Sequence, residues 1–315
     1  MKVIQFALHG EPEVLKVQEV ADPVPGSQDV LIEVKATSVN RLDLFQRSGS
    51  RPVPQLPFTP GLEAAGVVTQ DSNGFSKGER VLTTRANSAK GGGGYASKIA
   101  VHAQDLARIP DGVTFEQAVA AGLAASTAWG SLFDLGNLQA VERVLIWAGS
   151  SGVGSIAIQM AKHTGAWVAT TASSDKRGAE LRKLGADLVL NYKHENVSKL
   201  LQNQGGINLV IELVGTTLQT SLDACAPDAK IVLVGNLGGQ QATVDTQSWR
   251  LKRVHVLGGG IVHTSVANEE RVLKLIADKS IAPLIAETLP VDDAAKAHRM
   301  LSEGEPQGKI VLKHT

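Results

Sequence analysis

Short apolar runs alternate with stretches of helical spacing in the second half of the chain. The run 144–147 is short enough for a buried parallel strand, and apolar residues at helical spacing follow it between Val153 and Thr164. A second strand is expected over 167–172, and a second helix from Asp175 to Leu184, where Gly185 ends it. Further apolar runs lie at 188–190, 209–211 and 231–234, separated by helical stretches. This alternation predicts an α/β fold with a doubly wound parallel sheet and a ligand crevice at the carboxyl ends of its strands.

A glycine-rich turn joins the first of these strands to its helix. It consists of Gly149, Ser150, Ser151, Gly152, Val153 and Gly154. Glycine would let a pyrophosphate approach the backbone closely, while the first N–H groups of the helix and its dipole face the phosphate charge. Because Ser151 stands where a G-x-G-x-x-G motif has glycine, a turn that only allows close helix packing is the alternative. The strands and helices around the turn favour a dinucleotide site.

The residues before about 120 follow a different pattern. Short strand-like runs at 3–6, 15–17, 30–34, 66–68, 80–82 and 99–101 are separated by Pro and Gly turns. They predict a compact, mostly antiparallel barrel. The four glycines 91–94 are interpreted as a mobile loop at a cleft, with a merely permissive turn as the alternative. From Pro110 to Ala128 the sequence is helical and rich in alanine, and it is expected to bridge barrel and sheet with Ser126 and Thr127 near the junction.

Composition narrows the class of partner. The 315 residues suffice for two domains, and 31 Lys and Arg balance 31 Asp and Glu, which leaves no basic surplus for nucleic acid or an anionic membrane. A small-molecule partner is the default. The lone Cys225 excludes an internal disulfide framework and is expected to pack within an apolar helix. Without a signal-peptide pattern or an apolar run of membrane length, we expect a cytoplasmic protein.

Several further motifs are spread along the chain. In chain order they are 40–43 with Arg47 and Gly49, 60–68, 94–96, 126–129, the glycine turn with Gln159 and Lys162, 184–187 with 191–192, and 308–312. Taken together, they resemble the motifs of the zinc-independent quinone oxidoreductases, the zeta-crystallin-like family of the medium-chain dehydrogenase/reductase superfamily. The resemblance implies a GroES-like β-barrel catalytic domain over 1–120, completed by 263–315. It also implies a Rossmann dinucleotide-binding domain over 121–262.

Three departures from the motifs of related proteins bear on the chemistry. Zinc-dependent relatives carry Gly-His-Glu, whereas this chain has Gly61-Leu62-Glu63, and Asn40 lies in the neighbourhood where those relatives have a cysteine. Leucine cannot ligate zinc, so no metal site is predicted and a Lewis-acid mechanism is not expected. Ser50 stands where many similar quinone oxidoreductases have a tyrosine, so we expect the substrate wall to differ.

The coenzyme is predicted from the end of the second strand. NAD enzymes place an acidic residue there, but Asp175 lies where the helix should begin, so helix capping explains it. By resemblance, Ser173, Ser174, Lys176 and Tyr192 would surround the 2′-phosphate of NADP, although Lys176 and Arg177 forming a solvated helix face is the alternative. NADPH is therefore the predicted coenzyme. The resemblance assigns further coenzyme contacts to Thr127, Val214, Gly235, Asn236, Gly258, Gly259 and Lys309.

Without a metal, the substrate carbonyl must be polarised by hydrogen-bond donors. Asn40 and Tyr95 are the candidates, with Thr127 orienting the nicotinamide. The alternatives are that Asn40 caps a turn, that Tyr95 packs against the glycine loop, and that Thr127 bonds to its own helix.

Asp43 and Glu63 are interpreted as an acid/base pair or as buried partners of Arg41 or Arg47. The eight histidines show no paired metal-ligand spacing.

The predicted reaction is hydride transfer from NADPH to a quinone or to the β-carbon of an α,β-unsaturated carbonyl compound. An enoyl-thioester reductase and a non-enzymatic NADPH-binding structural or sensor protein are the alternatives. The apolar run 254–262 contains Gly258, Gly259 and Gly260 and is expected to form the edge of a homodimer, with a simple domain-return turn as the alternative.

Overall fold

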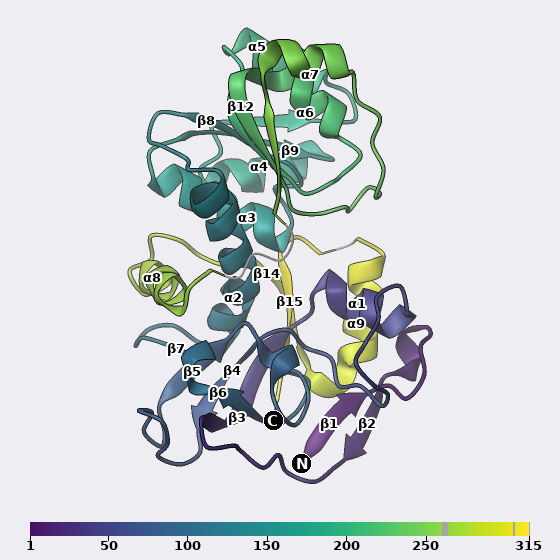
Figure 1. The fold of residues 1–315 in the computed structure, drawn as a ribbon, viewed down its shortest axis with the longest axis vertical. Coiled ribbons are helices and arrows are strands. Elements are labelled where there is room, and N and C mark those ends of the chain that lie inside the picture. The colour runs from purple at the N-terminus through teal and green to yellow at the C-terminus, as the bar shows by residue number, and fades with distance from the viewer. Residues whose placement is uncertain (260–263, 305, 315) are drawn as a thin grey trace. The chain divides into compact units, whose positions relative to one another are not determined.

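The computed structural model describes residues 1–259, 264–304 and 306–314, which form two compact units (Figure 1). One unit comprises Met1–Leu123 and Ser265–Thr315, and the other comprises Ala124–Thr264. The sequence motifs placed these divisions near residues 120 and 262. Each unit has its own sheets and its own buried apolar clusters.

The unit Ala124–Thr264 contains a six-stranded parallel sheet. Its strands are β8 (Arg143–Ile146), β9 (Trp167–Ala172), β10 (Leu188–Asn191), β11 (Ile207–Glu212), β12 (Cys225–Leu233) and β13 (His255–Gly258). They lie in the order β10-β9-β8-β11-β12-β13, which reverses between β8 and β11. This is the doubly wound Rossmann order, in which ligands bind at the carboxyl ends of the strands near the reversal. The predicted fold class is confirmed.

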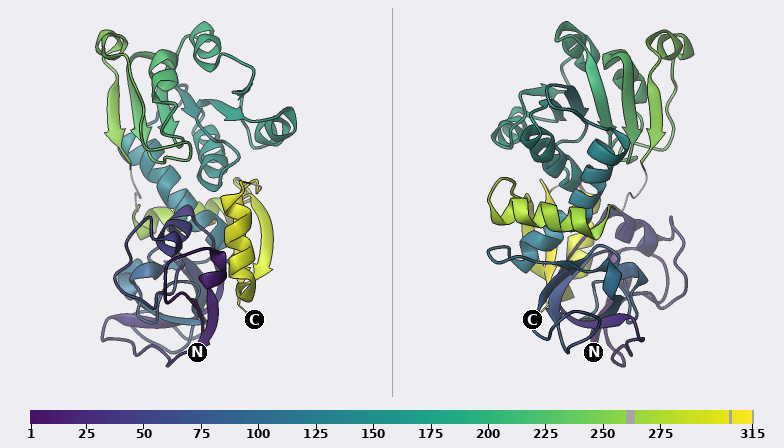
Figure 2. Two further views of the ribbon diagram at one scale, coloured as in Figure 1. Left: turned by 90° about the vertical axis from the view of Figure 1, so that its right-hand side faces the viewer. Right: turned by 60° about the vertical axis from the view of Figure 1, so that its left-hand side comes forward.

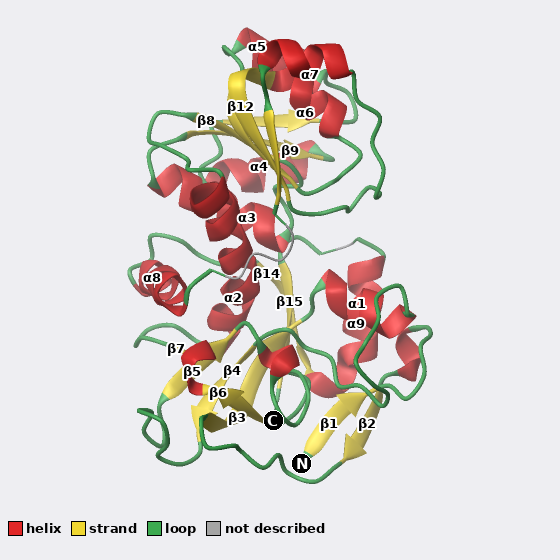
Figure 3. Cartoon of the chain, viewed as in Figure 1, coloured by secondary structure: helices red, strands yellow, loops and turns green. Residues whose placement is uncertain are grey.

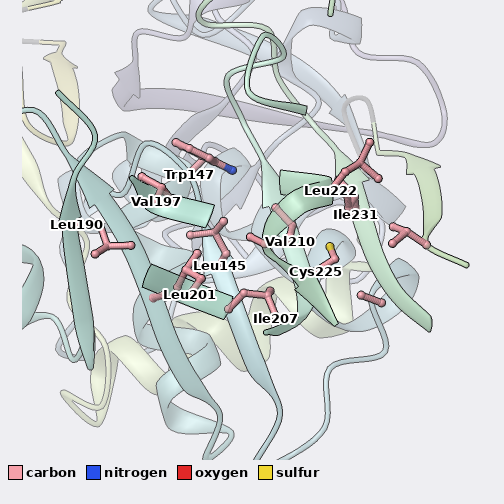
Figure 4. Packing of buried hydrophobic residues seen from close by; sticks show 14 residues of the cluster. Leu145, Trp147, Leu190, Val197, Leu201, Ile207, Val210, Leu222, Cys225 and Ile231 are labelled. Atoms are coloured by element: carbon pink, nitrogen blue, oxygen red, sulfur yellow. The ribbon is translucent and has the colours of Figure 1, made fainter. Parts of the chain in front are cut away.

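Helices cover both faces of this sheet (Figures 1 and 2). On one face lie α3 (Gly152–His163) and α4 (Asp175–Lys183), and on the other lie α5 (Val197–Asn203), α6 (Leu218–Ala224) and α7 (Thr246–Lys252). Figure 4 shows Leu145, Val210 and Ile231 of the strands meeting Leu201 and Leu222 of the helices. Each such fully buried side chain contributes about 1.5–3 kcal/mol to folding.

Cys225 is buried in this cluster, but the prediction that it lies in a helix is wrong. Its backbone is extended, with φ −64° and ψ 140°, because α6 ends at Ala224 and β12 begins at Cys225.

The unit built around the N-terminus contains a larger, mostly antiparallel sheet (Figure 3). Strands β14 (Ile285–Pro290), β15 (Lys309–Lys313), β3 (Asp29–Ser38), β4 (Ala64–Val68), β5 (Arg80–Thr83) and β7 (Ala107–Arg108) follow one another, and β6 (Lys98–His102) also pairs with β3. All pairs except β14 with β15 are antiparallel. A hairpin of β1 (Lys2–Gln5) and β2 (Lys16–Glu19) forms a separate two-stranded sheet.

The helices of this unit are α1 (Arg41–Ser48), α8 (Val266–Ala277) and α9 (Ala294–Ser302). Short 3-10 turns lie at Pro12–Val14, Ala86–Ser88, Ala103–Asp105 and Val291–Asp293. Helix α2 (Phe115–Trp129) contains the division between the units and continues as a π-helix over Gly130–Leu135. Among the described residues, only this segment is long and apolar enough to cross a membrane, but 78% of its apolar window is buried within the protein. Core helices of soluble proteins share that property.

Candidate active site

Strand pairing brings residues from opposite ends of the chain together in the first unit. Strand β15 pairs with the end of β3, where Val311 lies opposite Ser38, and the Val39 N–H donates to the Ile310 carbonyl at 3.0 Å. The chain then turns into α1 through Asn40, the N-cap residue of that helix. This pairing places Lys309 beside Asn40, although 269 residues separate them.

Asn40, Glu63 and Lys309 form a bonded cluster. The Lys309 ammonium donates to Asn40 Oδ1 at 2.6 Å and to Glu63 Oε1 at 3.1 Å. The Asn40 Nδ2 group donates to Glu63 Oε1 at 3.0 Å, which closes a triangle of contacts. Glu63 is fully buried and Lys309 is 6% exposed, so charge pairing and these hydrogen bonds offset part of the cost of removing both groups from water.

Two further donors complete the surroundings of the Glu63 carboxylate. The Ser38 hydroxyl donates to Oε1, and the Leu123 backbone N–H donates to Oε2 at 2.6 Å. The alternative in which Glu63 pairs with Arg41 or Arg47 is wrong, since its cationic partner is Lys309. Two guanidinium nitrogens of Arg47, Nε and Nη1, are buried without a partner among the described residues.

Asp43 is the second buried carboxyl of this region. It accepts from the backbone N–H of Asn40 at 2.8 Å and from that of Gly61 at 3.0 Å, so an arginine does not hold it either. Complete burial raises the pKa of Asp43 to about 7, and the two backbone donors oppose that shift. This carboxyl therefore titrates near neutral pH, whereas Glu63 has a direct ion-pair partner.

The second half of the glycine stretch 91–94 packs closely against the backbone segment that carries Glu63. Gly93 and Gly94 are buried, and their N–H groups donate to the carbonyls of Thr59 and Gly61 at 3.0 Å. A Cβ on Gly94 would lie 2.2 Å from the Glu63 carbonyl oxygen. At Gly93 and Gly94, burial and these hydrogen bonds favour the alternative of a turn over that of a mobile loop, because the missing side chains let one backbone segment lie directly against another.

Tyr95 follows these glycines and points into the apolar interior of its unit. Its side chain is fully buried, and its hydroxyl bonds to His298 Nε2 at 2.9 Å. Burial raises the pKa of Tyr95 and lowers that of His298 to about 3, so both side chains are neutral near pH 7. The geometry favours the packing alternative for Tyr95 over a role as a donor to substrate.

The phosphate turn lies in the other unit, between β8 and α3. The Ser151 hydroxyl accepts from the Gly154 N–H at 3.0 Å and caps the helix, while the N–H groups of Gly152 and Val153 have no acceptor among the described residues. A Cβ on Gly149 would lie 2.2 Å from Thr170 Oγ1, so glycine is needed there for packing as well. These features fit a pyrophosphate held by the first turn of a helix.

The candidate 2′-phosphate residues come together at the ends of β9 and β10. These strands pair so that Asn191 lies opposite Ala172, and the Tyr192 N–H donates to the Ala172 carbonyl at 3.3 Å. Ser173 and Ser174 follow Ala172, Ser174 caps α4, and Asp175 and Lys176 occupy its first turn. Asp175 therefore begins the helix, as predicted. Tyr192 is 51% exposed, so solvent reaches this part of the unit.

The sequence reasoning missed Glu212, the last residue of β11. Its buried carboxylate accepts from the N–H groups of Val214 and Gly215 at 2.9 and 3.0 Å and from the hydroxyls of Thr217 and Ser221 at 2.8 Å. It thereby shapes the loop that carries Val214. An acidic residue directly after an apolar strand run was the available signal.

The remaining predicted contacts are spread over the molecule. Gly235 and Asn236 follow β12, Gly258 ends β13, and the Gly259 N–H donates to the Leu233 carbonyl at 2.7 Å. Gly260 lies outside the described residues. Thr127 lies in α2, where its carbonyl accepts from Ser131 Oγ at 2.7 Å. Lys309, assigned to the coenzyme by resemblance, lies in the first unit with Asn40.

The residues around Glu63 do not fit a metal ion. Leu62 is buried where a ligand would be needed, and the Lys309 ammonium holds the Glu63 carboxylate. Within the described part of the chain, no group of three or more His, Cys, Asp or Glu side chains could hold a metal.

Comparison with known protein families identifies the class of protein to which this chain belongs. Residues 26–111 match the family model of the alcohol dehydrogenase GroES-like domain, and residues 152–278 match that of the zinc-binding dehydrogenases. Together with the fold, these matches define a medium-chain dehydrogenase/reductase.

Relatives that match over nearly the whole chain identify the family within this class. The chain is 33% identical to a quinone oxidoreductase of Pseudomonas aeruginosa over 99% of both chains. It is similar to the crystal structure of Escherichia coli quinone oxidoreductase complexed with NADPH, with a TM-score of 0.90, 29% identity and complete coverage of both chains. A crystal structure of an NAD-dependent alcohol dehydrogenase matches over the same span with a TM-score of 0.90 and 26% identity. The chain belongs to the quinone oxidoreductase family.

Proposed function

We propose that this protein transfers hydride from NADPH to a quinone or to the β-carbon of an α,β-unsaturated carbonyl compound, without a metal. The observation that supports the proposal is the buried Asn40–Glu63–Lys309 cluster. Its ammonium and carboxylate are bonded beside Asn40 and directly after Leu62, the positions at which the sequence motifs of zinc-dependent relatives have cysteine and histidine. An activated electrophile needs only hydrogen-bond donors at its oxygen, because it delocalises the incoming charge itself.

NADPH is preferred to NADH in this proposal because of the residues at the ends of β9 and β10. Lys176 in the first turn of α4 supplies a positive charge, and the hydroxyls of Ser173, Ser174 and Tyr192 supply donors. An NAD-specific site needs an acidic side chain on the ribose, but Asp175 begins the helix instead. Bound NADPH would supply the hydride from its nicotinamide ring. The family includes structures solved with NADPH, which agrees with this choice.

The test is oxidation of NADPH, followed by absorbance, with a quinone, an enone, an enal and an enoyl thioester. We expect turnover with the quinone or the enone, a much lower rate with NADH, and no effect of a chelator. Preference for the enoyl thioester would instead identify an enoyl-thioester reductase. Tight NADPH binding without turnover of any acceptor would identify a coenzyme-binding structural or sensor protein.

A further inference from the structure

In the Asn40–Glu63–Lys309 cluster, the hydrogen-bond donors outnumber the acceptors by one N–H group of the Lys309 ammonium. The Asn40 amide nitrogen donates to Glu63 Oε1 at 3.0 Å and, more weakly, to the Ser38 carbonyl at 3.4 Å, so both of its protons face the protein. A lysine ammonium carries three donors. Among the described residues, that of Lys309 has two acceptors, Asn40 Oδ1 and Glu63 Oε1.

We propose that Lys309 is the catalytic donor that stabilises the negative charge developing on the acceptor's oxygen, and that Asn40 and Glu63 are the residues that position its ammonium. This inference rests on the proposed function and deepens it. It replaces the simpler prediction that Asn40 itself donates to the substrate, since the amide protons of Asn40 are already engaged.

The fold holds this ammonium firmly. Lys309 is the first residue of β15, and its backbone N–H donates to the Leu284 carbonyl at 2.8 Å. Gly308 before it has φ +99°, and a Cβ there would lie 2.1 Å from the same Leu284 oxygen. With the backbone fixed and the side chain bonded twice, little reorganisation is needed when charge develops on a substrate.

Charge makes lysine a better donor than the asparagine amide. Hydrogen bonds from a cation to an oxyanion are about twice as strong as neutral ones. In the reaction the hydride brings its electron pair to the acceptor, whose oxygen becomes negative. One proton from water then completes the hydroquinone, or the saturated ketone by protonation at the α-carbon. Lys309 donates a hydrogen bond throughout and keeps its own proton, so it needs no reprotonation.

The test compares Lys309→Met with Lys309→Arg and uses Lys313→Met as the matched control. Lys313 lies on the same strand, but its side chain is half-exposed and pairs with Glu116 at 2.7 Å. We expect Lys309→Met to slow single-turnover hydride transfer by about 10²- to 10³-fold, as the loss of one oxyanion donor does elsewhere. The dissociation constant of NADPH should stay close to that of the unmodified protein. Lys309→Arg should recover much of the rate, and Lys313→Met should change neither quantity.

Other outcomes would overturn the inference. A Lys309→Met protein that binds NADPH more weakly but transfers hydride at the normal rate would make Lys309 a coenzyme residue. If removing Lys309 prevents folding by leaving Glu63 unpaired, the double variant Lys309→Met/Glu63→Gln removes that charge and should show the same slow transfer. Normal transfer in the double variant would refute the inference. An unmodified protein that reduces none of the acceptors would refute the proposed function and this inference together.

Discussion

The buried Tyr95–His298 pair gives a stability prediction that is independent of catalysis. His298 is fully buried on α9, its ring lies edge-on to Tyr95 with centroids 5.8 Å apart, and its Nε2 bonds to the Tyr95 hydroxyl. The perturbation is His298→Gln. A glutamine amide can still bond to the Tyr95 hydroxyl, but it cannot take up a proton.

The size of the effect follows from the pKa. Burial lowers the pKa of His298 from 6.5 to about 3 in the folded protein. Between these values the unfolded chain binds a proton that the folded chain does not, so stability falls as pH falls. With about 1.36 kcal/mol for each pH unit below 6.5, the loss at pH 5 relative to pH 8 is about 2 kcal/mol.

Other buried groups also titrate in this window, so only a comparison of variants isolates His298. His314, whose pKa burial lowers to about 4, acts in the same direction. Asp43 and Glu269, whose pKa values burial raises to about 7, act in the opposite direction, because their folded forms bind protons more readily. These contributions are common to the unmodified protein and the variant.

The assay is urea unfolding at pH 8 and pH 5, followed by circular dichroism. We expect the unmodified protein to lose about 2 kcal/mol more stability than His298→Gln between the two pH values. Tyr95→Phe is the matched control, since it removes the hydroxyl but leaves His298 to titrate. It should cost about 1 kcal/mol at both pH values and keep the pH dependence. Equal pH dependence in the unmodified protein and His298→Gln would refute the reasoning.

The same Tyr95→Phe protein tests the catalytic role of the tyrosine. Because its hydroxyl is enclosed with His298, we expect hydride transfer to stay close to the normal rate. A loss of about 10²-fold or more would restore Tyr95 as a donor to the substrate.

Three further predictions concern coenzyme, metal and assembly. Lys176→Ala should weaken NADPH binding by about 10- to 160-fold, because a charge-assisted contact contributes about 1.5–3 kcal/mol. Calorimetry should show unchanged NADH binding by this variant. The control Lys183→Ala, at the other end of α4, should bind NADPH as the unmodified protein does. Equal affinity of the unmodified protein for both coenzymes would contradict this. Elemental analysis should find no stoichiometric zinc, and a tightly bound zinc needed for turnover would overturn the metal-free proposal. If β13 forms a homodimer interface, Val256→Lys on this edge strand should weaken the dimer in a sedimentation experiment. A monomeric unmodified protein at micromolar concentration would contradict the predicted homodimer.

Local patterns in the sequence determined most of the fold. The apolar run 167–172 is strand β9, and α4 begins at Asp175 as its capping pattern indicates. A buried parallel strand appears in the sequence as a short apolar run, and an amphipathic helix appears as apolar residues at helical spacing. Each can therefore be predicted from its own residues. Cys225 shows the limit, because a buried apolar residue at a helix end can equally begin the next strand.

The tertiary structure alone decided which charges meet. Glu63 had two nearby arginines in the sequence as candidate partners, yet its counterion is Lys309, which reaches it because β15 pairs with β3. Tyr95 likewise meets His298 across 203 residues of chain. A strand pattern records which face of the strand is buried, but not which distant strand lies beside it. The sequence could therefore indicate the residues of this site, whereas their hydrogen-bond partners depended on the packing of the whole unit.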